Sequence, residues 1–159
     1  ASETDPAKLQ AALDEYVQST LPLSLYEKAW AAAEAARPVH VHVDAMRLRQ
    51  IIDNLMENAL RVSPQGSQIH LAIHTDSAIA DGSYAVIEVR DSGPGLSEDD
   101  LAVAFEPGAL HERYRGVRPV GTGLGLALVD RLASRMGGAA AVTSSPGVGS
   151  SFWIRIPLA

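Results

Sequence analysis

The chain of 159 residues can form one domain with a sizeable core, and its hydrophobic share of 47% is typical of a folded protein. A net charge of -6 and a pI near 5.3 argue against nucleic acid or an anionic membrane surface as the main partner. The absence of cysteine excludes disulfides and thiolate chemistry, and no apolar run reaches the roughly 20 residues of a membrane span. Any anionic ligand must therefore be held by a local group of residues.

The N-terminal part is polar and rich in alanine. It predicts two short helices, at residues 1–23 and 24–37, and proline follows or interrupts each of them. Neither helix carries a recognisable site. Val39–Val43 then alternates valine with histidine, which predicts a half-exposed strand.

The next stretch, 47–63, predicts the longest helix, capped by Asp44. Asn54, Asn58 and Arg61 follow one another at helical spacing along one edge of it. Asparagine is a mediocre helix former, so two on one edge require a reason. Amide oxygens suit Mg²⁺ and an arginine suits the phosphates that accompany such an ion. The alternative is that the amides face solvent or bond to neighbouring loops.

Two strands follow, at residues 69–73 and 84–90. In the second strand Asp91 continues the alternation of the buried set, so its carboxylate is predicted to point inward and to need hydrogen-bond donors. Gly93 and Gly95 come next, and they allow the backbone to approach a ligand closely or to adopt positive φ. The alternative is a tight turn capped by Asp91.

A short helix is predicted at 97–104, with Ser97 as its cap. From Phe105 to Val120 the periodic pattern ends and arginine, glycine and proline accumulate. We interpret this segment as a long mobile loop, and loops of this length are typically lids or binding segments.

A glycine-rich turn at 121–126 opens the last predicted helix, which ends at Gly137. Such a turn offers backbone N–H groups and the positive end of a helix dipole to an anion. The alternative is a flexible hinge, because the spacing is neither the dinucleotide fingerprint nor a Walker A loop. Residues 139–144 and 150–157 predict a β-hairpin that closes the chain.

The order of the motifs resembles that of the ATP-binding catalytic domain of sensor histidine kinases. The motifs are Asn-x-x-x-Asn, Asp-x-Gly-x-Gly, Phe-Glu-Pro, an arginine-rich loop and Gly-Thr-Gly-Leu-Gly-Leu. That family belongs to the wider group with DNA gyrase, Hsp90 and MutL. The resemblance implies a two-layer α/β sandwich of the Bergerat type: a mixed sheet of about five strands with three helices on one face. It covers residues 37–159, so residues 1–36 are expected to be a helical lead-in from a preceding domain.

The resemblance also assigns roles to residues. Asn54 and Asn58 look like the Mg²⁺-binding N-box, Arg61 stands where the family usually has a phosphate-binding Lys or Arg, and Asp91 looks like the carboxylate that accepts the adenine amino group. The remaining nucleotide-binding positions that it implies are Gly93 and Gly95 near the base, Arg113, Arg115 or Arg118 in the lid, and Gly121, Thr122, Gly123, Leu124 and Gly125 around the phosphates. Phe105 matches the F-box of the family.

Three departures from the family are visible. Val62 stands where the family often has His, Tyr or Phe beside the nucleotide, so a stacking or hydrogen-bonding contact is expected to be lost. The lid has Pro107-Gly108 where the family has an aromatic residue and an arginine. No phosphoacceptor histidine precedes the domain, and His111, the one histidine followed by an acid, is a poor candidate because it lies in the lid.

The resemblance implies binding of Mg·ATP and transfer of the γ-phosphoryl group to a histidine on a separate dimerisation domain, and from there to a response regulator. The chain itself then supplies no general base, and we expect it to work in the cytoplasm as part of a membrane-bound sensor kinase. Three alternatives remain: an ATPase of the gyrase or Hsp90 kind, an anti-sigma-type serine kinase, and a nucleotide-binding module without transfer activity. The first two usually carry a Glu four residues before the N-box Asn, where this chain has Asn54.

Overall fold

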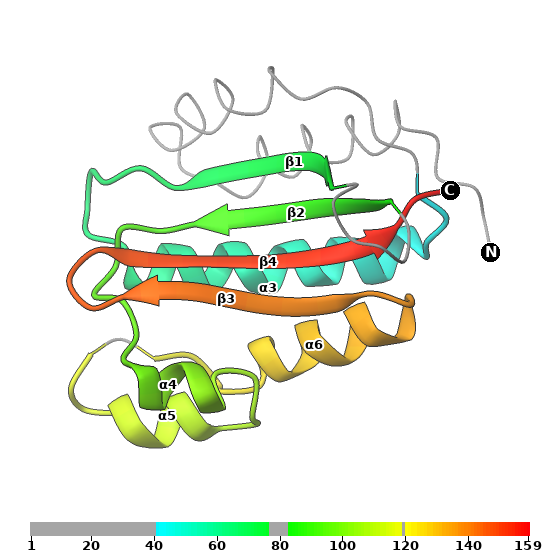
Figure 1. Cartoon of the computed structure of the whole chain (residues 1–159). Helices are drawn as coiled ribbons and strands as arrows, with labels where there is room; N and C mark the ends of the chain where they lie inside the picture. Colours follow the sequence, from blue (N-terminus) through cyan, green and yellow to red (C-terminus); the bar gives the residue numbers. More distant parts are fainter. Residues whose placement is uncertain (1–40, 77–82, 119) are drawn as a thin grey trace.

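The computed structural model describes residues 41–76, 83–118 and 120–159 (Figure 1). The two N-terminal helices predicted above, and the boundary between residues 36 and 37, lie outside the described residues.

The described strands form one sheet with the order β1-β2-β4-β3. They are β1 (His70–Asp76), β2 (Tyr84–Arg90), β3 (Ala139–Ser145) and β4 (Gly149–Pro157). The expectation that the sheet mixes parallel and antiparallel strands is wrong for the described part, because all three pairings are antiparallel. Short connections at 77–83 and 146–148 impose this direction on the two hairpins. Where a fifth strand was predicted, Val41 makes a single bridge to Leu158.

Helices α3 (Ala45–Val62) and α6 (Gly125–Arg135) cover one face of the sheet, and α4 (Glu98–Val103) and α5 (Ala109–Tyr114) lie together beside β3 (Figure 1). The Asp44 side chain caps α3 as predicted, by accepting hydrogen bonds from the backbone N–H groups of Met46 and Arg47. The apolar side of α3 is buried against the sheet, with Leu48, Ile51, Ile52, Leu55, Met56 and Ala59 in the core. The two-layer α/β sandwich is therefore confirmed. No helix in the described ranges is long and apolar enough to cross a membrane.

Strand β2 directs one acidic side chain into the molecule. Its residues Ala85, Ile87 and Val89 are buried, and Ile87 pairs with Ile73 on one side and Ile154 on the other. Asp91 continues this alternation and is only 4% exposed, which confirms the inward orientation predicted from the sequence.

The predicted structureless loop at 105–120 is partly helical. Residues 109–114 form α5, which begins after Gly108 in the left-handed conformation (φ +77°). The sequence Ala-Leu-His-Glu-Arg-Tyr contains several good helix formers, and six residues are too few for a clear periodic pattern. Before it, Phe105 packs edge-to-face on Phe152 of β4, with ring centroids 6.3 Å apart.

Candidate functional site

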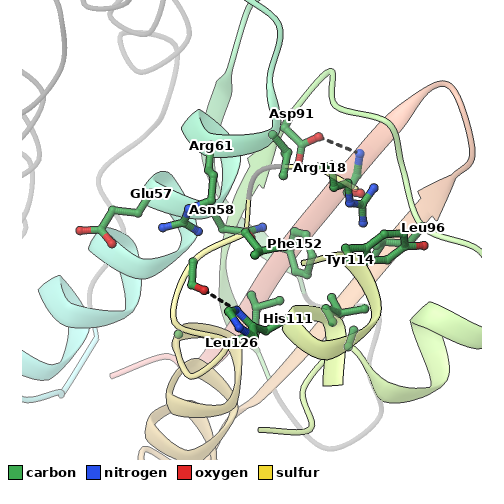
Figure 2. Close-up of a pocket in the computed structure, with 18 of the residues that line it drawn as sticks. Glu57, Asn58, Arg61, Asp91, Leu96, His111, Tyr114, Arg118, Leu126 and Phe152 are labelled. Carbon is green, nitrogen blue, oxygen red and sulfur yellow. Dashed lines mark hydrogen bonds between the residues drawn. The ribbon is translucent and has the colours of Figure 1, made fainter. Parts of the chain in front are cut away.

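A cleft lies between the edge of α3, the end of β2, the lid helix α5 and the glycine-rich turn (Figure 2). Its cavity volume is about 140 Å³. Most of the predicted site residues line it: Asn54, Asn58, Arg61, Asp91, Gly95, Gly121, Thr122, Gly123 and Gly125. Four predicted residues do not: Gly93, Arg113, Arg115 and Leu124. Motifs that are far apart in the sequence therefore converge on one cavity.

The carboxylate of Asp91 has one occupied and one free oxygen. Oδ1 accepts hydrogen bonds from the backbone N–H groups of Gly93 (2.8 Å) and Ser150 (3.3 Å). Oδ2 is buried and has no partner. Burial raises the pKa of Asp91, although these two hydrogen bonds and the positive charge of Arg118 oppose the shift. A buried acceptor without a partner is costly unless a ligand supplies a donor, so Oδ2 is suited to receive an N–H group.

Gly93 supports Asp91 instead of lining the cleft. A Cβ at this position would lie 2.8 Å from Val62 Cγ2 and 2.9 Å from Asp91 Oδ1. Its small size therefore lets Val62 pack against the loop while its N–H fixes the carboxylate.

Gly95 is required by the close approach of two loops. Its φ is +73°, and a Cβ would lie 2.1 Å from the Ser145 carbonyl oxygen at the end of β3. The loop is held on the β3–β4 turn by hydrogen bonds from Gly147 N–H to Pro94 O (2.8 Å) and from Leu96 N–H to Ser144 Oγ (2.8 Å).

The edge of α3 meets the glycine-rich turn directly. A Cβ on Gly121 would lie 2.6 Å from the Arg61 guanidinium, and a Cβ on Gly125 would lie 2.7 Å from Asn54 Oδ1. The Asn54 amide nitrogen donates to the Gln50 carbonyl (2.7 Å), so its orientation is fixed and Oδ1 remains as an acceptor. The amide pair, the arginine and the start of α6 thus form one end of the cleft.

This contact gives a first prediction. With Asn54 as the Mg²⁺ ligand that the resemblance implies, Gly125→Ala should displace the Asn54 amide and weaken Mg²⁺-dependent nucleotide binding by about tenfold. Stability should change by less than about 1 kcal/mol because alanine suits a helix. Titration of nucleotide at several Mg²⁺ concentrations measures the effect. In an Asn54→Ala background the same substitution should do nothing further, and an additive second loss would contradict transmission through Asn54.

The lid helix is attached to the glycine-rich turn. Gly108 N–H donates to the Gly123 carbonyl (2.8 Å), and His111 Nδ1 lies 2.7 Å from the Gly121 carbonyl oxygen (Figure 2). A Cβ on Gly123 would come within 2.7 Å of His111 Cβ, so this glycine allows the close contact. The lid and the turn are therefore positioned together.

The lid arginines differ in position. Arg113 forms an ion pair with Asp100 (2.8 Å), and Arg115 is 67% exposed and lies 3.9 Å from Glu112. Arg118 instead lines the cleft and donates to the Gly95 carbonyl (3.2 Å). Its guanidinium carbon lies 3.6 Å from the centre of the Tyr114 ring. Of the three lid arginines named from the sequence, the structure brings Arg118 to the site, not Arg113 or Arg115.

Sequence reasoning assigned no ligand role to His111 or Tyr114, which both line the cleft. These two residues are three apart and share one face of α5, so a helical reading of the lid would have found them.

Asp100 of α4 holds the lid helix α5 in place through hydrogen bonds. It is fully buried, forms a capping box with Ser97, and accepts hydrogen bonds from Arg113 and from the Tyr114 hydroxyl. Burial alone would raise the pKa of Asp100, but the hydrogen bonds outweigh it and lower this pKa from 3.8 to about 2. The hydrogen bond from the Tyr114 hydroxyl to Asp100 also raises the pKa of Tyr114.

Within the described ranges, no group of three or more His, Cys, Asp or Glu residues is placed to hold a metal ion. The polar side chains of α3 that line the cleft are Asn54, Glu57, Asn58 and Arg61.

Comparisons with known proteins identify the family of this chain. Residues 43–159 match the family described as histidine kinase-, DNA gyrase B-, and HSP90-like ATPase. The sensor histidine kinase RcsC of Escherichia coli (strain K12) is 41% identical over 123 residues, which are 76% of this chain and 12% of RcsC. The sensor protein TorS of the same organism is 44% identical over 115 residues, 72% of this chain and 12% of TorS. The chain therefore spans a small part of these relatives.

Solved structures show the same fold. The crystal structure of full-length ShkA in complex with AMPPNP has a TM-score of 0.68 and 27% identity, and the match covers 99% of this chain and 31% of ShkA. The mycobacterial sensor histidine kinase MprB also gives a TM-score of 0.68, at 21% identity, over 99% of this chain and 97% of that one.

Proposed function

Because this chain belongs to the histidine kinase-, DNA gyrase B- and HSP90-like ATPase family, as the ATP-binding catalytic domain of a histidine kinase, we propose that it binds Mg·ATP. The bound nucleotide then delivers its γ-phosphoryl group to a histidine on a separate dimerisation domain. One observation carries the proposal: the unpartnered Asp91 Oδ2 lies in the same cleft as the contact between Arg61 and the glycine-rich turn.

The chemistry of Asp91 supports binding of the adenine base at its end of the cleft. An adenine amino group would donate to Oδ2, which is buried and otherwise lacks a donor. The neighbouring apolar lining includes Leu96, Leu126 and Phe152, against which the flat base can pack.

The phosphate end is supported by Arg61 and by the backbone of the turn that opens α6. The Oδ1 atoms of Asn54 and Asn58 are hard ligands suited to Mg²⁺, and the phosphates would complete its shell. The cavity of about 140 Å³ is smaller than the roughly 300–1,000 Å³ of typical ligand pockets, so we expect the lid to open when nucleotide enters.

No residue of the described cleft is proposed as a general base. Glu57 contributes to the lining, but Figure 2 shows its carboxylate directed away from Asn58 and Arg61. The position four residues before Asn58 is Asn54, which cannot activate water. Phosphoryl transfer to a histidine needs mainly positioning and charge neutralisation, so this observation favours a kinase over a gyrase-type ATPase or an anti-sigma-type kinase.

The proposal includes partners outside this chain. They are the histidine-bearing dimerisation domain of the full-length protein and a response regulator that receives the phosphoryl group, and the site of action is the cytoplasm. The relatives named above are sensor proteins, which supports this assignment.

The test combines the chain with the dimerisation domain of its own full-length protein and ATP labelled at the γ-phosphate. Acid-labile label should appear on the dimerisation domain, and removal of the acceptor histidine should abolish it. Saturable ATP binding without any transferred label would instead favour a nucleotide-binding module that lacks transfer activity.

A further inference from the structure

His111 holds a defined tautomer. Its Nδ1 lies 2.7 Å from the Gly121 carbonyl oxygen, and a carbonyl oxygen only accepts hydrogen bonds. Nδ1 therefore carries the proton, and the second ring nitrogen, Nε2, remains for another partner. The ring belongs to the lining of the cleft.

Gly121 is flanked by two side chains from different elements. The Arg61 guanidinium of α3 approaches its α-carbon, and the His111 imidazole of α5 binds its carbonyl oxygen. Both side chains line the same cavity, at the turn whose backbone leads into α6. The chain has no lysine after residue 28, so arginine and histidine are the cations available at this turn.

We propose that His111 is a further phosphate-binding residue: its Nδ1–H fastens the lid helix to the glycine-rich turn, and its Nε2, protonated on binding, donates to the phosphate chain of the nucleotide. This inference rests on the proposed function. Neutral imidazole with the proton on Nδ1 presents a lone pair at Nε2, which repels phosphate oxygens. Binding that protonates Nε2 therefore draws a proton from the buffer, and histidine is the type of side chain that changes charge near neutral pH.

The charged and titratable groups around the ring decide whether this uptake is favoured. Those in the same cleft are Glu57 and Arg61 from α3, Asp91 after β2, Glu106 before α5, and Tyr114 and Arg118 from the lid. The two arginines disfavour a third positive charge and the carboxylates favour it. Glu112, the neighbour on α5, is 70% exposed and lies near Arg115, so it contributes little. The phosphate chain adds the negative charge that favours the imidazolium.

His111→Asn separates the two roles. The asparagine amide nitrogen can replace Nδ1 as the donor to Gly121, but nothing replaces Nε2. The matched control is His70→Asn, an exposed histidine of β1 on the sheet. Calorimetric titration with Mg·ATP and with AMP, in buffers of different ionisation enthalpy near pH 7, gives both the affinity and the number of protons taken up.

We expect His111→Asn to weaken Mg·ATP binding about tenfold, to leave AMP affinity within about twofold, and to abolish the proton uptake that accompanies ATP binding in the wild type. His70→Asn should behave as the wild type. Unchanged ATP affinity and proton uptake in His111→Asn would overturn the inference, as would an equal loss for ATP and AMP, which indicates a structural role. The wild-type chain supplies a test that no variant affects: proton uptake with ATP but not with AMP. Failure of the wild type to bind ATP at all would instead refute the proposed function.

Discussion

Asp91→Asn is expected to weaken Mg·ATP binding by about a hundredfold, or about 3 kcal/mol. The backbone N–H groups of Gly93 and Ser150 both donate to Oδ1, so they will select the amide oxygen of asparagine for that position. The amide NH₂ then occupies the place of Oδ2 and meets the adenine amino group donor to donor. Calorimetric titration measures the loss.

Two controls make this result specific. Asp99→Asn changes an exposed carboxylate of α4 in the same way and should leave ATP affinity unchanged. Inosine triphosphate carries an acceptor where ATP carries the amino group, so Asp91→Asn should lose much less affinity for it than for ATP. Equal affinity of wild type and Asp91→Asn for ATP would refute the adenine assignment.

The variant should also remain folded. Since burial raises the pKa of Asp91 in the folded state, its ionised form is less favourable there than in the unfolded chain at neutral pH. Removing this charge is therefore not expected to lower the free energy of unfolding, and thermal denaturation can separate lost binding from lost structure.

The elements with a long periodic pattern could be predicted from the sequence. The apolar residues of α3, the cap at Asp44 and the alternation that buries Asp91 are local features, and the structure has all three. The predicted hairpin at the C-terminus is also confirmed, because β3 pairs with β4 from Ala139 opposite Arg155 to Ser145 opposite Gly149. The prediction of a mixed sheet was wrong about the direction of the strand pairings, because it was taken from the family resemblance and not from the connections in this chain.

The lid could not be predicted, for two physical reasons. Helix α5 has six residues, so its pattern is too short to distinguish from a loop. The position of each lid side chain is decided by contacts far along the chain: Arg113 pairs with Asp100, 13 residues away, and Arg118 binds Gly95, 23 residues away. Three arginines in one loop have similar local sequences, and nothing local indicates which of them reaches the cleft.

Asp100→Ala is expected to lower the free energy of unfolding by about 3 kcal/mol. The substitution removes the capping box of α4 and leaves Arg113 and Tyr114 without their buried acceptor. Chemical denaturation measures the change, with Asp99→Ala, the exposed neighbour in the same helix turn, expected to stay within about 0.5 kcal/mol of the wild type. Equal effects of the two variants would contradict the role of Asp100.

The pH dependence of this difference gives an independent check. The folded pKa of Asp100 is about 2 against an ordinary value of 3.8, so its ionised form stabilises the fold above pH 3.8. As the pH falls from about 4 to about 2, up to about 2 kcal/mol of this stabilisation is lost in the wild type but not in Asp100→Ala. The gap in stability between the two proteins should therefore narrow across that window. A gap that stays constant there would mean that the carboxylate contributes through packing and not through its charge.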